Sequence, residues 1–301
     1  MSDGHAATLR PPRDADVAGV ARLCDAMWPS AITEAEIRRI WSSPTITAET
    51  DVRIAVEEDG TPAGYADVYD PGGGGSTYWA WIHGRPGPAL VEWALSRATE
   101  LSSGPGARLL CATWSEDANV KAALAGAGFR LARHSYRMEI ELAGDEPEAR
   151  VPAGLTVRSF RAGDERAVYE AHQETFADAR DHTRQPYDEW AHWSLESADF
   201  DPSLWFLAFD EAELAGIALC MREEDEEGVG WVSTLGVRRP WRRRGLGGAL
   251  LRHAFAAFAR RGFRAVGLGV DAESLTGAHR LYESAGMRVA AVWDVYEHAV
   301  S

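Results

Sequence analysis

The sequence predicts an α+β protein that contains two copies of one unit, and three observations predict it. The segments TLRPPRDADVAGVARLCDAMW and LTVRSFRAGDERAVYEAHQETF each have the pattern of a short strand, an Asp-containing turn and a helix. The segments RIAVEEDGTPAGYADVY and WFLAFDEAELAGIALCM each have two apolar runs around an acidic turn, which is typical of a β-hairpin. Each half ends with a helix that closes at Ala-Gly and a last strand, so two copies account for the whole length.

The two copies are separated by an acidic segment, AGDEPEARVPAG, at residues 143–154. This segment combines Gly, Pro and charged residues and has no apolar period, which is the pattern of a linker. We therefore expect one domain over residues 1–142 and a second domain over residues 155–301.

The second copy shows its elements most clearly. Leu251, Phe255 and Phe258 recur at helical spacing, which predicts an amphipathic helix that begins at a cluster of glycines. In the second copy we expect strands near 155–159, 204–210, 214–222, 229–237, 264–270 and 287–296, and helices near 164–176, 186–197, 245–261 and 274–285.

Composition limits the kind of protein. With 301 residues, of which 46% are hydrophobic, the chain is long enough to bury the cores of two domains. The start MSDGHAATLR lacks the pattern of a signal peptide, and no apolar run approaches the roughly 18–20 residues of a membrane span. We expect a cytoplasmic protein with no membrane partner. The formal net charge of −15 disfavours nucleic acid as a partner.

Neither a disulfide framework nor a metal site is expected. Cys24, Cys111 and Cys220 are far apart and surrounded by apolar residues, which favours buried reduced thiols. The histidines show no HExxH motif or other close ligand spacing.

Positive charge gathers at one point of this acidic chain. The stretch RRPWRRRGLGGALL places five arginines and three glycines between a predicted strand and the predicted helix at 245–261. The first amides of a helix have no intrahelical partners and carry the positive end of the helix dipole, and glycines let a ligand approach them. Arginines add forked donors that suit phosphate oxygens. The stretch therefore predicts a diphosphate site.

Two familiar phosphate motifs do not fit this stretch. It lacks the Gly-Lys-Ser/Thr ending of a P-loop, and Leu250 stands where the dinucleotide motif GxGxxG requires its third glycine. A solvated turn and a nucleic-acid patch remain as alternatives, although no nucleic-acid recognition motif accompanies the arginines.

The pattern that does fit is RxxGxG, from Arg242 to Gly247, directly after a strand that ends in Leu-Gly-Val. With this motif the second copy resembles the GNAT superfamily of acyl-CoA-dependent N-acetyltransferases. The resemblance implies, for each unit, a mixed and mostly antiparallel central sheet flanked by helices, and it implies acetyl-CoA as the co-substrate. By resemblance, acetyl-CoA is bound by Leu235, Gly236, Val237, Arg242, Arg243, Arg244, Gly245, Leu246, Gly247, Gly248, Ala249, Ser274, Ala278 and Tyr282.

The segment VDAESLTGAHRLYESAGMRV is similar to the last motif of the family. Ala278, Leu281–Tyr282 and the Gly-Met pair that ends at Met287 match that motif. Two positions depart from it, since Ser274 replaces an asparagine and Met287 replaces a phenylalanine. Serine keeps a hydroxyl that can form a hydrogen bond.

The resemblance also implies a mechanism, in which the acetyl group passes directly to a primary amine of a small molecule or a protein N-terminus. A backbone N–H of the strand, at Val237, would stabilise the oxyanion, and Tyr282 would protonate the departing thiolate. The alternative for Tyr282 is that its ring only packs on the sheet. Candidates for the base that takes the proton from the amine are Glu223, Glu224, Asp271 and Glu273.

The stretch EEDEE at residues 223–227 has two interpretations. It has the composition of a solvated hairpin tip, and it would also attract a cationic amine. The sequence does not decide between them.

The first copy lacks the features of a coenzyme site. It offers one arginine, Arg85, and places Pro86 and Pro88 where backbone N–H donors would be needed. The residues Ala122–Leu124 stand where Leu-Tyr would fall. We expect residues 1–142 to be a degenerate copy that shapes the acceptor cleft. The alternative to an enzyme is a sensor that binds acyl-CoA without catalysis, and the sequence leaves the oligomeric state open.

Overall fold

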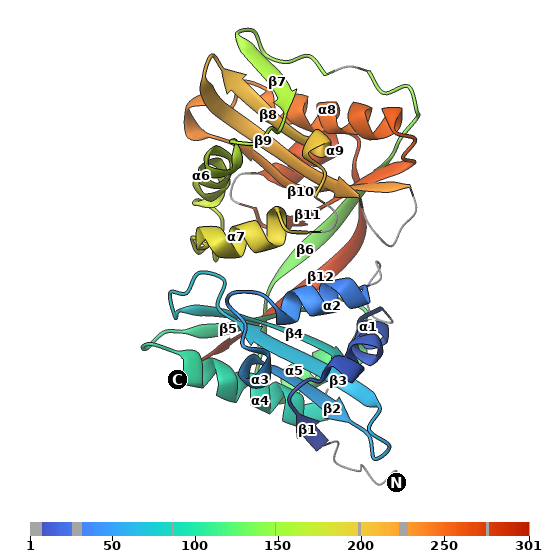
Figure 1. The fold of residues 1–301 in the computed structure, drawn as a ribbon, viewed down its shortest axis with the longest axis vertical. Helices are drawn as coiled ribbons and strands as arrows, with labels where there is room; N and C mark the ends of the chain where they lie inside the picture. Colours follow the sequence, from blue (N-terminus) through green and yellow to red (C-terminus); the bar gives the residue numbers. More distant parts are fainter. Residues whose placement is uncertain are drawn as a thin grey trace. The chain divides into compact units, whose positions relative to one another are not determined.

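The computed structural model describes residues 8–25, 32–85, 87–147, 149–197, 200–222, 228–274 and 277–300. The chain forms two compact units (Figure 1). Unit 1 comprises Met1–His134 and Trp293–Ser301, and unit 2 comprises Ser135–Val292.

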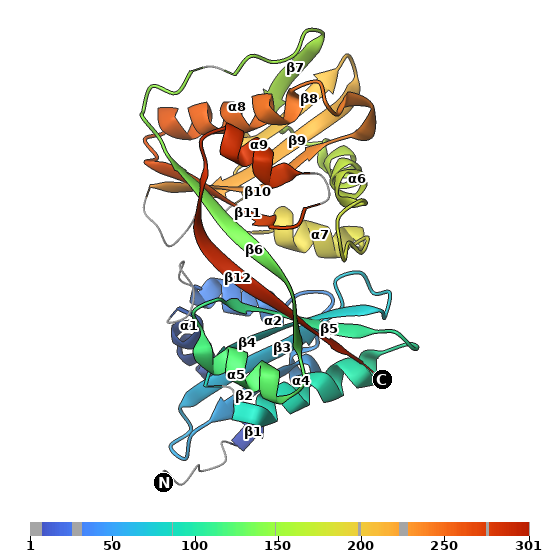
Figure 2. The same cartoon turned by 180° about the vertical axis from the view of Figure 1, so that it is seen from behind.

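Unit 1 is a mixed sheet between two layers of helices. Its strands follow the order β1, β2, β3, β4, β5 and β12, and only β4 and β5 are parallel. Helices α1 and α2 cover one face (Figure 1), and α4 and α5 cover the other (Figure 2). The elements are β1 (Thr8–Arg10), α1 (Val17–Asp25), α2 (Glu34–Trp41), α3 (Ala48–Asp51), β2 (Val52–Val56), β3 (Pro62–Tyr69), β4 (Thr77–Gly84), α4 (Gly87–Leu101), β5 (Arg108–Trp114), α5 (Ala118–Gly126) and residues 293–299 of β12 (Arg288–Ala299).

Unit 2 repeats this plan. Its strands follow the order β7, β8, β9, β10, β11 and β6, and only β10 and β11 are parallel. Helices α6 and α7 cover one face (Figure 1), and α8 and α9 cover the other (Figure 2). The elements are residues 135–141 of β6 (Arg130–Glu141), β7 (Leu155–Ser159), α6 (Glu165–Phe176), α7 (Tyr187–Ser194), β8 (Trp205–Asp210), β9 (Glu213–Arg222), β10 (Val229–Val237), α8 (Leu246–Arg260), β11 (Ala265–Asp271) and α9 (Ala278–Ser284).

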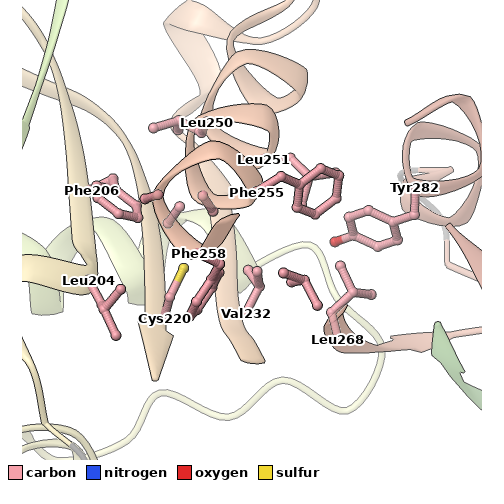
Figure 3. Close-up of a cluster of buried hydrophobic side chains, with 14 of the residues drawn as sticks. Leu204, Phe206, Cys220, Val232, Leu250, Leu251, Phe255, Phe258, Leu268 and Tyr282 are labelled. Atoms are coloured by element: carbon pink, nitrogen blue, oxygen red, sulfur yellow. The ribbon is translucent and has the colours of Figure 1, made fainter. Parts of the chain in front are cut away.

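Alternation along the strands produces two separate cores in unit 2. Trp205 and Leu207 of β8 pack under α6 and α7, whereas Phe206 and Ala208 pack under α8. Leu251, Phe255 and Phe258 form the buried face of α8, as their spacing predicts (Figure 3).

Most expected boundaries in the second copy lie within one residue of the structure. Helix α7 ends at Ser194 where the expected helix runs to 197, β12 ends at Ala299 where the expected strand runs to 296, and the start of α9 differs most. The helix was expected from residue 274 but begins at Ala278, because a turn comes first. In that turn the N–H of Ser274 donates to the carbonyl of Asp271 at 3.1 Å, and the N–H of Gly277 donates to Ser274 at 3.0 Å.

The compact units differ from the expected ranges 1–142 and 155–301, because strands are exchanged between the two copies. Strands β6 and β12 each have 12 residues, about twice the usual strand length. The second half of β6 pairs with β11 of unit 2 from Ser135↔Asp271 to Glu141↔Ala265. The second half of β12 pairs with β5 of unit 1 from Trp293↔Trp114 to Ala299↔Arg108. Each unit therefore contains a strand from the other half of the sequence.

Cys24, Cys111 and Cys220 are buried, as expected. In the part of the chain that the structure describes, no helix has the length and the apolar character that crossing a bilayer requires.

Candidate active site

The candidate site of unit 2 begins where two parallel strands diverge. Strands β10 and β11 pair only from Val229↔Ala265 to Trp231↔Gly267 within the described residues. A bulge follows on β10 between Val232 and Thr234, and bulges bend a strand and increase its twist. The rest of β10 consequently has a free edge toward β11.

The free edge of β10 carries backbone groups that can bind a ligand. The N–H of Arg238 donates to the carbonyl of Ala215 on β9 at 3.0 Å. Because backbone groups alternate along a strand, Gly236 has the same orientation as Arg238, and Leu235 and Val237 direct their amides to the opposite edge. Gly236 lies close under α6, since a Cβ at this position would lie 2.4 Å from the hydroxyl of Thr175.

The turn after β10 leads into α8 through glycines. Gly245 is the N-cap in the left-handed conformation, with φ of 82°, and it has no side chain to cap the helix. The first helical hydrogen bond runs from the N–H of Ala249 to the carbonyl of Gly245 at 3.0 Å. The earlier amides of the turn, those of Leu246, Gly247 and Gly248, therefore have no intrahelical acceptor.

The arginines of this turn fall into two groups. Arg238 pairs with Glu174 at 2.7 Å, while Arg239 and Arg242 share Asp178 at 2.5 and 2.8 Å. Hydrogen bonds from Arg239 and then Arg242 lower the pKa of Asp178 to about 2. Arg242 also donates to the carbonyl of Val237 at 3.0 Å. These three arginines fix the turn to the end of α6.

Arg243 and Arg244 form the second group. Both are exposed, and neither pairs with a carboxylate of the described residues. Arg243 has φ of 59°, a conformation that costs energy for a residue with a Cβ. The sequence predicts that Arg242, Arg243 and Arg244 bind the coenzyme; of these three, Arg242 pairs with Asp178 in the structure.

Tyr282 lies on α9, in the core between the helices α8 and α9 and the sheet. Its side chain is buried with Phe255 of α8 and Leu268 of β11, and its hydroxyl is directed toward the space between them (Figure 3). The hydroxyl has no hydrogen-bond partner among the described residues. Burial raises the pKa of Tyr282 to about 12, so the phenol stays protonated at neutral pH.

Helix α9 reaches the glycine turn through Leu281. A Cβ on Gly247 would lie 3.3 Å from this leucine, and a Cβ on Gly248 would lie 3.5 Å from it. The adjacent residues Ala278 and Ser274 are half-buried at the start of α9 and in the turn before it. Thus the structure brings together the β10 edge, the glycine turn and the closing motif.

The carboxylates expected to act as the base are less clearly placed. Glu273 is exposed and pairs with Arg180 at 3.3 Å, and its N–H donates to Asp271 at 2.8 Å. Asp271 is half-buried at the end of β11. Glu223 and Glu224 lie outside the described residues.

Residues missed by the sequence reasoning are Thr175, Asp178 and Arg252. Asp178 binds arginines more than 60 positions later in the chain, and the guanidinium of Arg252 lies 3.4 Å from the position of a Cβ on Gly248. A helical spacing of four residues between Gly248 and Arg252 was the one available signal.

Unit 1 differs at the corresponding places. Its strands β4 and β5 also diverge, after Ala80↔Cys111, but Trp114 and Trp293 pack edge to face there with ring centres 5.6 Å apart. The cavity that remains beside these rings has a volume of about 10 Å³.

The charge of Arg85, in the turn after β4, is also compensated by a carboxylate. Arg85 pairs with Glu57 of the β2–β3 hairpin at 3.0 Å, on one side of a pocket of about 330 Å³. Asp59 and Asn119 also line this pocket, so its charged groups are two carboxylates and one guanidinium.

Known proteins resemble the chain over almost all of its length. Residues 166–287 match the model of the acetyltransferase (GNAT) family. A mycothiol acetyltransferase of Geodermatophilus obscurus is 33% identical over 268 residues, which cover 84% of this chain and 83% of the relative. A mycothiol acetyltransferase of Salinispora arenicola is 31% identical over 293 residues, which cover 92% and 91%.

Solved structures agree with these matches. A GCN5-related N-acetyltransferase from Sphaerobacter thermophilus has a TM-score of 0.76 at 31% identity and covers 97% of this chain and 95% of its own. A tandem GNAT protein from the clavulanic acid biosynthesis pathway has a TM-score of 0.73 at 15% identity and covers 98% of both chains, which supports the tandem fold. The chain belongs to the GNAT family of acetyltransferases.

Proposed function

We propose that unit 2 carries out the acetyl transfer and that the acceptor is a primary amine. As a member of the GNAT family the protein is an acyltransferase, and acetyl-CoA is its co-substrate. The observation that carries the proposal is the uncapped glycine turn of α8, which lies at the end of the free β10 edge and beside the helix of Tyr282.

The residues of unit 2 fit coenzyme A. The diphosphate needs donors and positive charge, which the amides of Leu246, Gly247 and Gly248 and the exposed Arg243 and Arg244 supply. An extended pantetheine arm needs a strand edge, which β10 offers after its last pair with β11. In unit 1, aromatic rings fill the divergence and Glu57 neutralises the one arginine of the turn.

Bound acetyl-CoA would supply a thioester carbonyl that an amine can attack. The amide of Val237, or that of Leu235 on the same edge, would donate a hydrogen bond to the oxygen on which charge develops. Tyr282 would donate its proton to the departing sulfur, because its pKa of about 12 keeps it protonated in the working range.

A carboxylate would take the proton from the amine. Glu223 and Glu273 remain our candidates. Glu273 is exposed and would act through water, since its carboxylate already contacts Arg180.

The relatives direct the choice of acceptor. Because they are called mycothiol acetyltransferases, an amine precursor of mycothiol is the first acceptor to test. A wider panel of small amines and peptide N-termini would follow.

The test combines CoA release with a variant of the glycine turn. Gly247→Val should weaken acetyl-CoA binding about 100-fold, because a side chain there blocks two amide contacts of roughly 1.4 kcal/mol each. Gly104→Val is the control, since Gly104 is exposed in unit 1 and has open space around it. Unchanged acetyl-CoA affinity of Gly247→Val would contradict a coenzyme site in unit 2. Binding without CoA release for any amine would contradict the enzyme and favour a sensor.

A further inference from the structure

We infer that Arg252 is a further contact of the acyl donor, one that binds a phosphate group of coenzyme A and so favours donors that carry phosphate. This inference rests on the proposed coenzyme site of unit 2. It concerns a residue outside the RxxGxG stretch, on the second turn of α8.

The position of Arg252 follows from helix geometry. A side chain four residues after Gly248 lies on the same face of the helix and leans toward the helix N-terminus. The guanidinium nitrogen Nη1 of Arg252 lies 3.4 Å from the point that a Cβ of Gly248 would occupy. A glycine at residue 248 thus leaves room for this guanidinium directly beside the uncapped amides.

The guanidinium is also available for a ligand. Arg252 is exposed, and none of the carboxylates in the described ranges pairs with it. This separates it from Arg238, Arg239 and Arg242, each of which pairs with the carboxylate of Glu174 or Asp178. With Arg243 and Arg244 it makes a group of three uncompensated arginines around one turn, in a chain with a net charge of −15.

Coenzyme A offers two kinds of phosphate to such a group, the diphosphate and the 3′-phosphate of the ribose. Both present oxygens that a forked guanidinium binds well. The contact would add to binding and leave the chemical step unchanged, since it is remote from the thioester.

The experiment compares Arg252→Ala with Arg260→Ala across three acetyl donors. Arg260 is exposed on the last turn of the same helix, ~12 Å further along the axis, so its removal changes the net charge equally. The donors are acetyl-CoA, acetyl-dephospho-CoA, which lacks the 3′-phosphate, and S-acetylpantetheine, which has no phosphate. Steady-state KM and kcat are measured for each pair.

We expect Arg252→Ala to raise the KM for acetyl-CoA about 10-fold at unchanged kcat and to leave the KM for S-acetylpantetheine as in the wild type. Arg252→Lys should recover part of the loss. A similar loss with acetyl-dephospho-CoA assigns the contact to the diphosphate, and no loss with that donor assigns it to the 3′-phosphate.

Two results would overturn the inference. One is an acetyl-CoA KM that Arg252→Ala changes no more than Arg260→Ala does. The other is an equal rise in KM for S-acetylpantetheine, which would indicate a distorted helix. If Gly247→Val weakens acetyl-CoA binding while Arg252→Ala does not, only the inference fails. If neither variant does, the proposed site itself is wrong.

Discussion

Tyr282 combines a buried ring with one polar atom that has no partner among the described residues. Its side chain is 7% exposed, and it packs in the same core as Phe255 and Leu268. The oxygen itself is not among the fully buried polar atoms without a partner, so it remains accessible to a ligand group. In the proposed function that group is the sulfur of acetyl-CoA.

Tyr282→Phe should lower kcat by roughly 10²-fold and leave the affinity for acetyl-CoA almost unchanged. Phenylalanine keeps the packing of the ring, so the variant should fold. A thiolate can leave without a full proton, so the loss in kcat should lie at the low end of the range for a general acid. Turnover under conditions where chemistry is rate-limiting measures it. Tyr296→Phe, on β12, is the control. A wild-type kcat for Tyr282→Phe would make the tyrosine a packing residue.

The turn between β10 and α8 shows how much of the site a sequence can specify. The glycines and the strand-to-helix order depend on local patterns, so their roles could be predicted from the sequence. The sequence could not show which arginines pair with a carboxylate and which do not. Arg242 and Arg243 are neighbours of equal chemistry, and only the approach of Asp178, from the turn after α6, distinguishes them. That approach depends on tertiary packing, which no local period records.

The double variant Arg243→Ala/Arg244→Ala should raise the KM for acetyl-CoA at least about 10-fold, because it removes uncompensated charge from the turn. Its KM should also depend less on ionic strength than that of the wild type, since fewer exposed charges attract the donor. Arg239→Ala should have a small effect, because that guanidinium is already paired with Asp178. An equal KM rise in both variants would contradict the two-group division of the arginines.

The exchange of strands between the two copies was not predictable from the sequence. The apolar pattern of residues 287–296 correctly indicates a strand. Such a pattern does not determine to which sheet the strand belongs. The tandem repeat predicts two self-contained copies. Residues 293–299 instead complete unit 1, and Asp294 anchors them there. Its carboxylate accepts hydrogen bonds from Ser115 at 2.6 Å and His134 at 2.9 Å and pairs with Lys121 at 2.7 Å.

Asp294→Ala should destabilise unit 1 by about 2 kcal/mol, because it removes the buried carboxylate that accepts from three part-buried donors. Burial tends to raise the pKa of Asp294, but hydrogen bonds from Lys121, Ser115 and His134 outweigh burial and lower it. A lowered folded pKa means that this stability is full above the ordinary carboxyl pKa of about 4 and is lost as the pH falls.

The difference in unfolding free energy between wild type and Asp294→Ala should therefore shrink between about pH 5 and pH 3. Glu297→Ala is the control. Glu297 also lies on β12, but its 3.5 Å pair with Arg108 is about one-third exposed, so its loss should cost less than about 1 kcal/mol. Equal losses in the two variants, or a difference that grows in acid, would contradict the anchoring role.

The exchanged strand also has a consequence for protein synthesis. A ribosome makes the residues of unit 1 first, and a domain usually folds as soon as its own residues have emerged. In this chain one edge of β5 stays unpaired until residues 293–299 have been translated. These residues follow the last residue of unit 2. The nascent unit 1 therefore exposes an unpaired strand edge throughout the translation of unit 2, and an unpaired edge invites association with other chains. Unit 2, which receives residues 135–141 early, can complete its sheet before the unit that precedes it.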